Sequence, residues 1–547
     1  MKRNTLLTIF ILIIGTVVFG QNCPPGTIRL TSQSQVDSLI IDYPDCTEIT
    51  GSLIISPATD TIFNLDSLSQ LTYVSGSLVI ENNPALASLN GLQNIDSVGG
   101  GLIIRNLNEL QNLQGLNNIT QIGRDLTIEN SRRLRSLSGL DSLVNVRQWC
   151  LISGLDSLND LSGLGKLRNT GAVLGITNNG QLESLNGLDN IQSLGSLTLA
   201  LNSQLKDISV LSPITSLFGS LTLNQCPNLK DFSGLQNLEK LGALSIQNMG
   251  PMDMSAFASL DSILRDFGVS FQDSSIDFSG LENLAYIGYG FQVNQSPGIS
   301  SFEGLDKLNT IGGVLWVYRC DSLVDFTGLE SLNTTGRLAI LGNEQLKNLA
   351  GLENLEQIGG DLSISENPEL ISITALNKLT SMGGDLQVSY NEKLPSLEGL
   401  GNIDYKTIGS IQVNDCANLS MCNTKSICDH IEFDRANTVI MANMTGCGNI
   451  EQVEDKCGTY VSIDLKEELE SHLNIAPNPA RNVCVISWEN KFPTSTTLRI
   501  QDAMGKEILE SVFQDEFIFD TSSLPAGLYH CTFIIDDQRI AKTIVKQ

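Results

Sequence analysis

Histidine, the residue that most often acts as a general base or a metal ligand near neutral pH, is scarce in this chain. Only three histidines occur among 547 residues, and all lie late in the sequence: His430, His472 and His530. The long stretch before them therefore holds no histidine-based catalytic triad and no histidine metal site. The sequence also lacks a Cys-x-x-Cys pair, a phosphate-binding glycine loop and a calcium-binding repeat, so we expect no metal and no cofactor.

Carboxylates are abundant, and they leave one class of enzyme open. Polysaccharide-degrading enzymes built on β-helices work with two carboxylates held about 5–9 Å apart over a groove. The positions that should face outward here are mostly neutral: Val79, Ile103, Thr127, Thr198, Thr222, Ser245, Gln292, Ala339, Ser363 and Gln387. A β-helix enzyme is therefore an unfavoured alternative, and no catalytic residue is expected. The net charge of -27 also argues against nucleic acid as a partner, because phosphates would be repelled.

The segment VLWVYRC, residues 314–320, carries the side chains best suited to contact a ligand. Strand-like alternation around an inward Val317 sends both Trp316 and Tyr318 outward, with Arg319 beside them. Tyr289 lies one repeat earlier, at a turn. Rigidly held aromatic rings commonly contact carbohydrate or protein, although such a cluster can also merely cover a neighbouring loop. These four residues are the predicted ligand-binding residues.

A strict internal repeat must position these side chains. The Leu89 position of the pentad Ser88-Leu89-Asn90-Gly91-Leu92 recurs from Leu65 to Leu397 at intervals of 22 to 24 residues, which indicates a solenoid. Within one repeat, apolar residues are spaced by three and then by two at Leu102 and Ile104. Spacing by three suits polyproline-like or 3₁₀ segments, and spacing by two suits a short strand. We therefore predict a mainly β protein, a right-handed leucine-rich-repeat-like β-solenoid with about 16 coils of about 24 residues.

Several residue types recur at fixed places in the coils. Asparagines recur at a fixed distance after the strand and predict inward side chains that bridge adjacent coils: Asn83, Asn179, Asn202, Asn343, Asn367 and Asn391. Cys226, Cys320 and Cys416 fall at the same place and are expected to be buried thiols. Three phenylalanines at one core position predict a stacked spine: Phe278, Phe302 and Phe326. Glycines before the strand predict sharp turns with positive φ at Gly76, Gly100, Gly313, Gly360 and Gly384.

These repeats resemble known families. CTEITGSLII, from Cys46, is similar to the start of a receptor L domain, the leucine-rich-repeat-like β-helix of insulin- and epidermal-growth-factor-type receptor ectodomains. LSGLDSL and IGGDLSISENPEL resemble fungal cell-wall proteins of the same superfamily. The resemblance covers residues 46 to about 420 and implies the fold, whereas such folds carry many different ligands.

The ends of the solenoid need caps, because an uncovered end coil would expose its core. Cys23 and Cys46 bracket the segment before the first coil and predict a disulfide-closed N-cap over residues 21–52, ahead of the coils at 53–413. Residues 414–472 form a cysteine-rich C-cap and linker, in which CNTKSICDHIEF predicts a short helix. Its four cysteines allow three pairings, which the sequence leaves open: Cys422, Cys428, Cys447 and Cys457.

The last segment, residues 473–547, has alternating strands broken by turn residues, which predicts a small antiparallel β-sandwich. It resembles the C-terminal sorting domain of type IX secretion cargo in the Bacteroidetes. The match rests on Pro477, Asn478, Pro479, Gly505, Lys506, Pro525, Ala526, Gly527, Leu528 and Tyr529. The resemblance implies contact with the type IX secretion machinery, export across the outer membrane and removal of the tail. Cys484 and Cys531 lie on predicted strands as a possible disulfide pair, which the family does not require.

The first residues predict the route out of the cytoplasm. Basic Lys2 and Arg3 precede an apolar run from Leu6 to Phe19, so residues 1–20 are expected to be a secretory signal peptide. No other stretch is long and apolar enough for a membrane span. The favoured function is a non-catalytic secreted or cell-surface protein that presents its repeat face to a glycan or protein ligand. An inert structural spacer is the alternative.

Overall fold

The computed structural model describes residues 23–58, 61–251, 253–272, 278–457, 473–488, 496–503, 505–513, 516–535 and 538–547. The predicted signal peptide and the part of the predicted linker at 458–472 lie outside these residues. The described chain divides into two compact units. One runs to Cys422 and includes Asp429–Ile450, and the other comprises Asn423–Cys428 and the residues from Glu451 onward.

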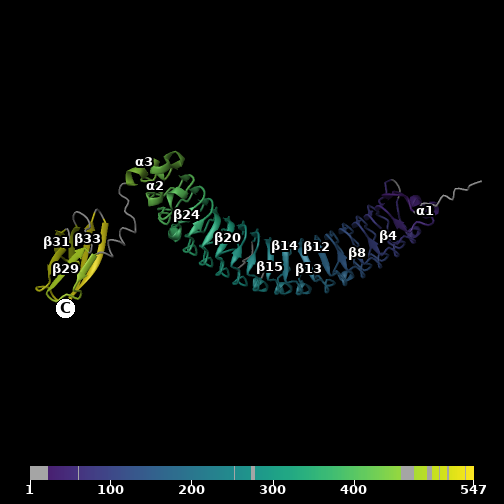
Figure 1. The fold of residues 1–547 in the computed structure, drawn as a ribbon, viewed down its shortest axis with the longest axis horizontal. Helices are drawn as coiled ribbons and strands as arrows, with labels where there is room; N and C mark the ends of the chain where they lie inside the picture. Colours follow the sequence, from purple (N-terminus) through teal and green to yellow (C-terminus); the bar gives the residue numbers. More distant parts are fainter. Residues whose placement is uncertain are drawn as a thin grey trace, which may run out of the picture. The chain divides into compact units, whose positions relative to one another are not determined.

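The first unit is a solenoid whose strands form one parallel sheet of 27 strands (Figure 1). Equivalent strands of successive coils pair with one another and form a column. The main column contains all sixteen predicted strands, from β3 to β26, and one more at each end, β1 and β27. Twelve strands belong to this column alone: β1 (Ile28–Leu30), β3 (Leu53–Ile55), β5 (Leu78–Glu81), β7 (Leu102–Arg105), β9 (Leu126–Glu129), β11 (Trp149–Ser153), β17 (Phe267–Ser270), β19 (Phe291–Asn294), β23 (Leu362–Ser365), β25 (Leu386–Ser389), β26 (Ile411–Asn414) and β27 (Thr438–Met441).

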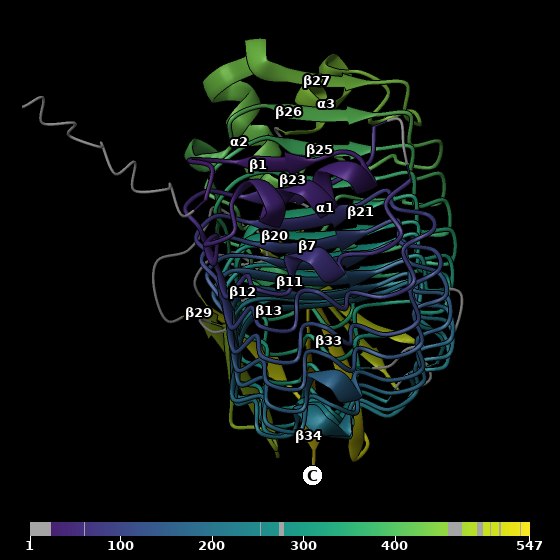
Figure 2. The same ribbon diagram turned by 90° about the vertical axis from the view of Figure 1, so that its right-hand side faces the viewer.

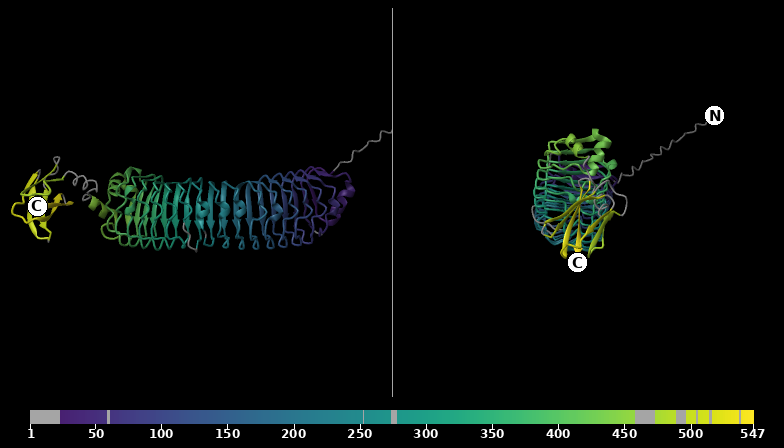
Figure 3. Two further views of the ribbon diagram at one scale, coloured as in Figure 1. Left: turned by 90° about the horizontal axis from the view of Figure 1, so that it is seen from below. Right: turned by 90° about the vertical axis from the view of Figure 1, so that its left-hand side faces the viewer.

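A second column of two-residue strands lies just before the main one and was not predicted. Its separate members are β2 (Glu48–Ile49), β4 (Tyr73–Val74), β6 (Ser97–Val98), β8 (Gln121–Ile122), β10 (Asn145–Val146), β16 (Ser262–Ile263), β18 (Tyr286–Ile287), β22 (Gln357–Ile358) and β24 (Ser381–Met382). In six coils the two columns run together as one strand: β12 (Asn169–Thr177), β13 (Ser193–Ala200), β14 (Ser216–Asn224), β15 (Lys240–Gln247), β20 (Thr310–Tyr318) and β21 (Thr334–Leu341). Figure 2, turned toward the end of the row, shows the coils superimposed, and Figure 3 shows the strands side by side.

The residues spaced by three form the return path, as predicted. The Leu92 amide donates to the Leu89 carbonyl, and the Ile95 amide donates to the Leu92 carbonyl, each over three residues as in a 3₁₀ turn. Six coils carry a 3₁₀ helix here: η1 (Asp66–Leu68), η2 (Ser162–Leu164), η3 (Ser209–Leu211), η4 (Ser233–Leu235), η5 (Met254–Phe257) and η6 (Thr374–Lys378). The four coils without a glycine at this corner, which have Ser67, Val210, Ala256 or Ala375, are all among these six.

The prediction of positive φ at the glycines before the strands was wrong. Gly76 and Gly100 do not have positive φ. The glycines at the other corner, such as Gly91 (φ 104°), do. Glycine is needed before the strands for space. A Cβ on Gly100 would lie 2.7 Å from the carbonyl carbon of Gly76 in the preceding coil, closer than Cβ atoms approach in proteins.

The predicted asparagines and phenylalanines do line the interior. All six asparagines are fully buried. The Asn343 amide donates to the Asn367 Oδ1 (3.0 Å), and the Asn367 amide donates in turn to the Asn391 Oδ1 (3.1 Å). Phe278, Phe302 and Phe326 are also fully buried and stack ring on ring. Cys226, Cys320 and Cys416 are buried thiols at the asparagine position, as predicted.

The residue between the main strand and this buried position has a left-handed backbone in coil after coil. It was not predicted, because most of these residues are not glycine: Asn82, Asn106, Asn130, Gly154, Asn178, Leu201, Gln225, Asn248, Phe271, Gln295, Arg319, Gly342, Glu366, Tyr390, Asp415 and Ala442. The backbone amides of these residues up to Asp415 donate to the next coil, as Asn106 does to the Glu129 carbonyl (3.1 Å). This shared bonding holds the left-handed turn, so residue type matters less there than usual.

The caps contain the helices and the disulfides. Helix α1 (Gln33–Asp42) lies at one end of the row and α2 (Lys425–Asp434), the predicted short helix, lies at the other (Figure 1). Helix α3 (Ile450–Cys457) follows, and η7 (Tyr405–Thr407) and η8 (Arg435–Asn437) are nearby 3₁₀ turns. The predicted Cys23–Cys46 disulfide is present, and the C-cap cysteines pair as Cys422–Cys447 and Cys428–Cys457.

The C-terminal residues form the predicted antiparallel sandwich. One sheet has strands β28 (Leu473–Ala476), β29 (Val483–Trp488) and β32 (Glu516–Asp520); the other has β30 (Thr496–Asp502), β31 (Glu507–Phe513), β33 (Gly527–Ile535) and β34 (Gln538–Lys546). The Cys484–Cys531 pair is not formed. Both side chains are free, fully buried thiols in the apolar core, one from each sheet. Burial, followed by the neighbouring Cys484, raises the pKa of Cys531 to about 12, so this thiol behaves as a small apolar side chain.

Candidate functional site

Strand β20 places the predicted aromatic residues on the outer face of the sheet. Leu315 and Val317 point into the core and are fully buried, whereas Trp316 and Tyr318 alternate with them and are half-buried. The two rings therefore point outward, as predicted, and are partly covered. In the neighbouring strands Trp316 pairs with Gln292 and Ala339, and Tyr318 pairs with Asn294 and Leu341.

Small residues of the next coil explain how the rings lie. Ala339 occupies an outward position yet is only 1% exposed, and we attribute this to the Trp316 ring beside it. A Cβ on Gly342 would lie 3.7 Å from Cε2 of Tyr318, so that ring extends over the next coil as well. Each ring is thus partly covered and partly open to solvent. We call Trp316, Tyr318 and Arg319 the aromatic platform.

Arg319 completes the platform through its backbone. It occupies the left-handed position after β20, with φ 53°, and its amide donates to the Leu341 carbonyl (3.0 Å). This turn brings the guanidinium carbon to 5.2 Å from the centre of the Tyr318 ring, where a cation is attracted by the π face. Among the described residues Arg319 forms no ion pair, so its charge remains available to a ligand.

Tyr289 is separate from the platform. It lies in the bend before β19, is largely exposed, and adjoins Gly313 of the next coil through a backbone hydrogen bond. Gly313 precedes Trp316 by three residues, which is about 10 Å along a strand. Tyr289 therefore stands at the edge of the sheet face and not beside the two rings.

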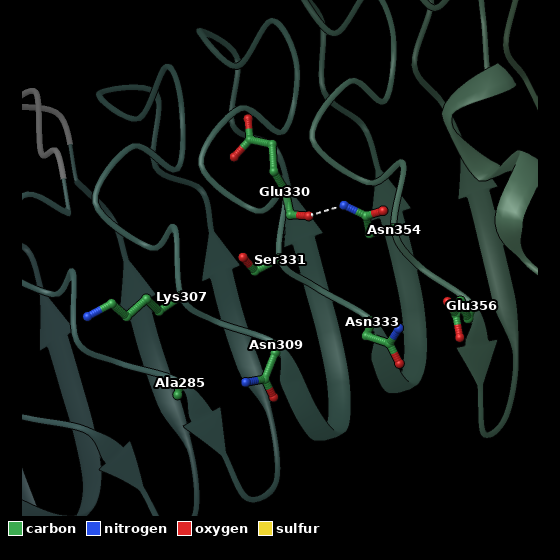
Figure 4. A pocket seen from close by; sticks show the side chains of 8 residues that line it. All are labelled: Ala285, Lys307, Asn309, Glu330, Ser331, Asn333, Asn354 and Glu356. Carbon is green, nitrogen blue, oxygen red and sulfur yellow. Dashed lines mark hydrogen bonds between the residues drawn. The ribbon is translucent and has the colours of Figure 1, made fainter.

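A polar groove lies on the side of these coils that Figure 4 draws. Its volume is about 550 Å³, and its lining is Ala285, Lys307, Asn309, Glu330, Ser331, Asn333, Asn354 and Glu356. Asn354 donates to the Glu330 carbonyl (2.6 Å), and Lys307 donates to the Oδ1 of Asn283 (2.7 Å) in the preceding coil. In Figure 4 the carboxylates of Glu330 and Glu356 stand apart. These polar groups are largely engaged in joining coils.

The exposed asparagines of that side form an outer ladder that sequence reasoning missed. Each side chain amide donates to a carbonyl of the preceding coil: Asn94 to Ser69, Asn118 to Gln93, Asn190 to Gly165, Asn237 to Ser212, Asn283 to Ala258, Asn354 to Glu330 and Asn402 to Asn377. Their regular place five residues after the Leu89 position was the available signal.

Several described groups with catalytic potential have structural partners or are buried. Asp361 accepts from the Asp385 amide (2.9 Å) and pairs with Arg337, and Asp385 accepts from the Ser410 hydroxyl (2.8 Å). His430 is fully buried in the C-cap, with its Nδ1 3.3 Å from the Tyr405 carbonyl oxygen. Burial raises the pKa of the Cys150 and Cys320 thiols to about 12, far from a reactive thiolate.

The residues of the sorting motif have defined roles in the sandwich. The Asn478 side chain donates to the Thr543 carbonyl (2.7 Å) and accepts from the Val545 amide (2.8 Å), which fixes the last strand. The backbone amide of Gly505, which has φ 79°, donates to the Asp502 carbonyl in the turn before β31, where the Lys506 backbone amide donates to the Asp502 Oδ1. The Tyr529 hydroxyl donates to the Pro525 carbonyl (2.8 Å), four residues back.

Comparison with known families finds a match in each part of the chain. Residues 474–547 match the Secretion system C-terminal sorting domain. The chain carries a type IX sorting domain. Residues 45–101 match the Receptor L domain, as the first repeats suggested. No curated protein matches the chain.

The sorting domain indicates export by the type IX secretion system, and hence a secreted or cell-surface protein that contacts the secretion machinery. The Receptor L domain suggests a binding role. Within the described residues, no helix is long and apolar enough to span a membrane. The same residues contain no cluster of three or more His, Cys, Asp or Glu side chains arranged to hold a metal ion.

Proposed function

We propose that this protein is a non-catalytic binding protein of the cell surface or the secreted fraction, and that the aromatic platform contacts its glycan or protein ligand. The observation that carries the proposal is the pair of rings held over Ala339 and Gly342. Because the coils on either side fix the strand, little conformational entropy is lost when a ligand covers the free ring faces.

The chemistry of the remaining groups favours binding over catalysis. The Asp361 and Asp385 carboxylates accept backbone or hydroxyl hydrogen bonds, and the solenoid thiols are buried with raised pKa values. A spacer protein would need neither the platform nor the uncompensated charge of Arg319. A polysaccharide-cleaving enzyme is the least supported alternative.

A glycan array and a cell-surface pull-down test the proposal. Wild-type protein is compared with Trp316→Ala/Tyr318→Ala, and Tyr390→Ala serves as the control, because Tyr390 is an exposed tyrosine three coils away from the platform. We expect the double variant to lose binding by about tenfold or more and the control to keep it. A ligand bound equally well by the double variant would show that the platform is not part of the binding site. Cleavage of a polysaccharide by the purified protein would refute the non-catalytic class.

We further propose that the mature protein lacks residues 1–20 and the tail from about residue 473. The sorting domain match over residues 474–547 supports the second cut. Mass spectrometry of secreted material should find neither terminus. Surface protein that ends at an intact Gln547 would contradict the removal of the tail.

A further inference from the structure

Three exposed aromatic side chains lie near the start of main strands that are three coils apart. Trp149 is the first residue of β11, Phe218 lies within β14 three residues before Leu221, and Tyr289 lies two residues before β19; they are 61%, 65% and 62% exposed. The strands β11, β14 and β19 are three coils apart in each step. At about 4.8 Å per coil, the rings recur every ~14 Å over a total of about 29 Å.

Glycines recur in the bends between these rings. A side chain cannot be accommodated at these positions, since a Cβ on Gly171 would overlap the Arg147 carbonyl and one on Gly288 would overlap the Leu264 carbonyl. Gly195, Gly219 and Gly242 are restricted in the same way. We call the row of segments between the two strand columns, with the three rings beside it, the bend row.

Arginines accompany the rings. Arg124 and Arg147 occupy adjacent bends beside Trp149, and Arg265 lies between Phe218 and Tyr289, with its Nη2 3.5 Å from the Phe218 carbonyl oxygen. All three are exposed and form no ion pair among the described residues. They are conspicuous in a chain of net charge -27.

The acidic residues of these bends are used by the fold. Asp125 accepts from the Trp149 amide (3.2 Å), and Asp266 accepts from the Gly290 amide (3.1 Å). Each carboxylate is thus directed at the next coil, whereas the neighbouring guanidinium is not. The bend row offers rings and unpaired cations together.

The bend row continues into a hollow. Beyond Tyr289 the bends of the next coils line a groove of about 450 Å³, with Gly312, Gly336, Gly359 and Gly383 on its floor and Thr334 and Gln357 at its side. A long ligand that follows the rings would reach this groove, in whose coils the exposed Arg337 pairs with Asp361. The whole surface is narrow and runs along the coils.

We propose that the bend row binds an extended polysaccharide that carries anionic groups, at a site separate from the aromatic platform. The apolar C–H face of a sugar ring packs on the negative face of an aromatic ring. Carboxylate or sulfate groups pair with the arginines. A folded protein partner fits less well, because such an interface needs about 800 Å² per side around a continuous buried centre. Rings separated by ~14 Å offer spaced contacts instead.

Affinity electrophoresis of the secreted protein tests this inference. The gels contain polygalacturonate, dextran sulfate or uncharged dextran, so that carboxylate, sulfate and neutral chains are compared. The variants are Trp149→Ala/Tyr289→Ala and Arg124→Gln/Arg147→Gln, with Trp316→Ala/Tyr318→Ala run alongside. All of these side chains except the half-buried platform rings are exposed, so the melting temperatures of the bend-row variants should match that of wild type.

We expect at least one anionic polysaccharide to retard the wild type, and the ring variant to bind about tenfold more weakly. The arginine variant should show a shallower dependence on salt, because fewer charges are neutralised on binding. Fragments too short to span about 29 Å should bind more weakly than long chains, since fewer contacts act together. Binding to only one of the two anionic polymers would identify the anionic group.

Four results would overturn the inference: no retardation by any polysaccharide, equal retardation by dextran, undiminished binding by both bend-row variants, or a protein ligand that requires these residues while no polysaccharide binds. The platform variant separates the two sites. If the platform variant binds the polysaccharide normally while the bend-row variants do not, the bend row is the polysaccharide site, even when no ligand of the platform is found.

Discussion

Phe302 and Phe326 stack with their ring centres 5.4 Å apart and their planes inclined by 11°. Phe278 continues the stack on the other side of Phe302, at 5.8 Å and 7°. Phe291 meets Phe302 edge-on at 5.9 Å. Phe302 is thus the ring through which neighbouring coils of the middle solenoid share one aromatic core.

Replacing Phe302 with alanine should lower the free energy of unfolding of the solenoid by about 3–5 kcal/mol, because the ring's burial and its contacts with three other rings are lost. Urea unfolding measures the change. Phe63→Ala is the matched control, since Phe63 is mostly exposed, and it should change stability by less than about 0.5 kcal/mol. Equal stability of the Phe302 variant and wild type would refute the assigned register of the core.

The corner glycines should differ from other glycines in their tolerance of a side chain. Gly351 has φ 101°, and a Cβ there would overlap the Phe326 carbonyl oxygen. Gly351→Val should therefore destabilise by at least about 2 kcal/mol, through both strain and the clash. Gly180 has no atom within 4 Å of its Cβ position and no positive φ, so Gly180→Val should be nearly neutral, and urea unfolding of both variants measures the difference. Similar losses in the two variants would show that the corner is not the cause.

The fold of the first unit was predictable because the same spacing of residue types recurs in each coil. The positions of Leu102, Ile104 and their equivalents predicted all sixteen strands. The aligned asparagines predicted the interior ladder, and the aligned phenylalanines predicted the stacked rings. Each inference needed only the spacing within one coil and the fact that coils stack. The Cys23–Cys46 disulfide was predictable for a related reason, since both residues flank an end that needs closing.

What escaped prediction depends on contacts between neighbouring coils. The two-residue strands, such as β6, contain a single inward residue, so they show no alternation of their own. Glycine is required in the bends because a Cβ would clash with carbonyl groups of the preceding coil, and not because of a positive φ. The outward direction of Trp316 and Tyr318 followed from alternation, but their coverage depends on Ala339 and Gly342 one coil later. Trp149 and Phe218 were missed because each is alone in its own repeat.

The buried asparagines should contribute more than the exposed ones. Asn367 accepts from the Asn343 amide and donates to the Ile340 carbonyl (3.1 Å), so Asn367→Ala leaves buried backbone groups without partners. We expect a loss of about 1–3 kcal/mol for each such group. Asn354→Ala removes one exposed hydrogen bond, to the Glu330 carbonyl, and should cost about 1 kcal/mol or less. Urea unfolding of both variants checks the order, and a larger loss at Asn354 would contradict it.

The buried thiols predict a loss of stability at high pH. Burial raises the pKa of Cys150 and Cys320 to about 12 in the folded protein, whereas an unfolded cysteine ionises near pH 8.5. Between about pH 9 and pH 12 the unfolded chain releases these protons and the folded chain keeps them, so raising the pH favours unfolding. Below pH 8 both states hold the protons and the thiols add no pH dependence.

Each thiol should lower the free energy of unfolding by about 1.4 kcal/mol per pH unit within that window. Urea unfolding at pH 7.5 and at several values up to pH 11 would compare wild type with Cys150→Ala/Cys320→Ala. The variant is less stable at every pH because of its cavities, but its stability should fall less steeply above pH 9. Lysine and tyrosine titrate in both proteins, so the difference between the two slopes isolates the thiols. Parallel slopes would show that these thiols ionise as readily in the folded solenoid as in the unfolded chain.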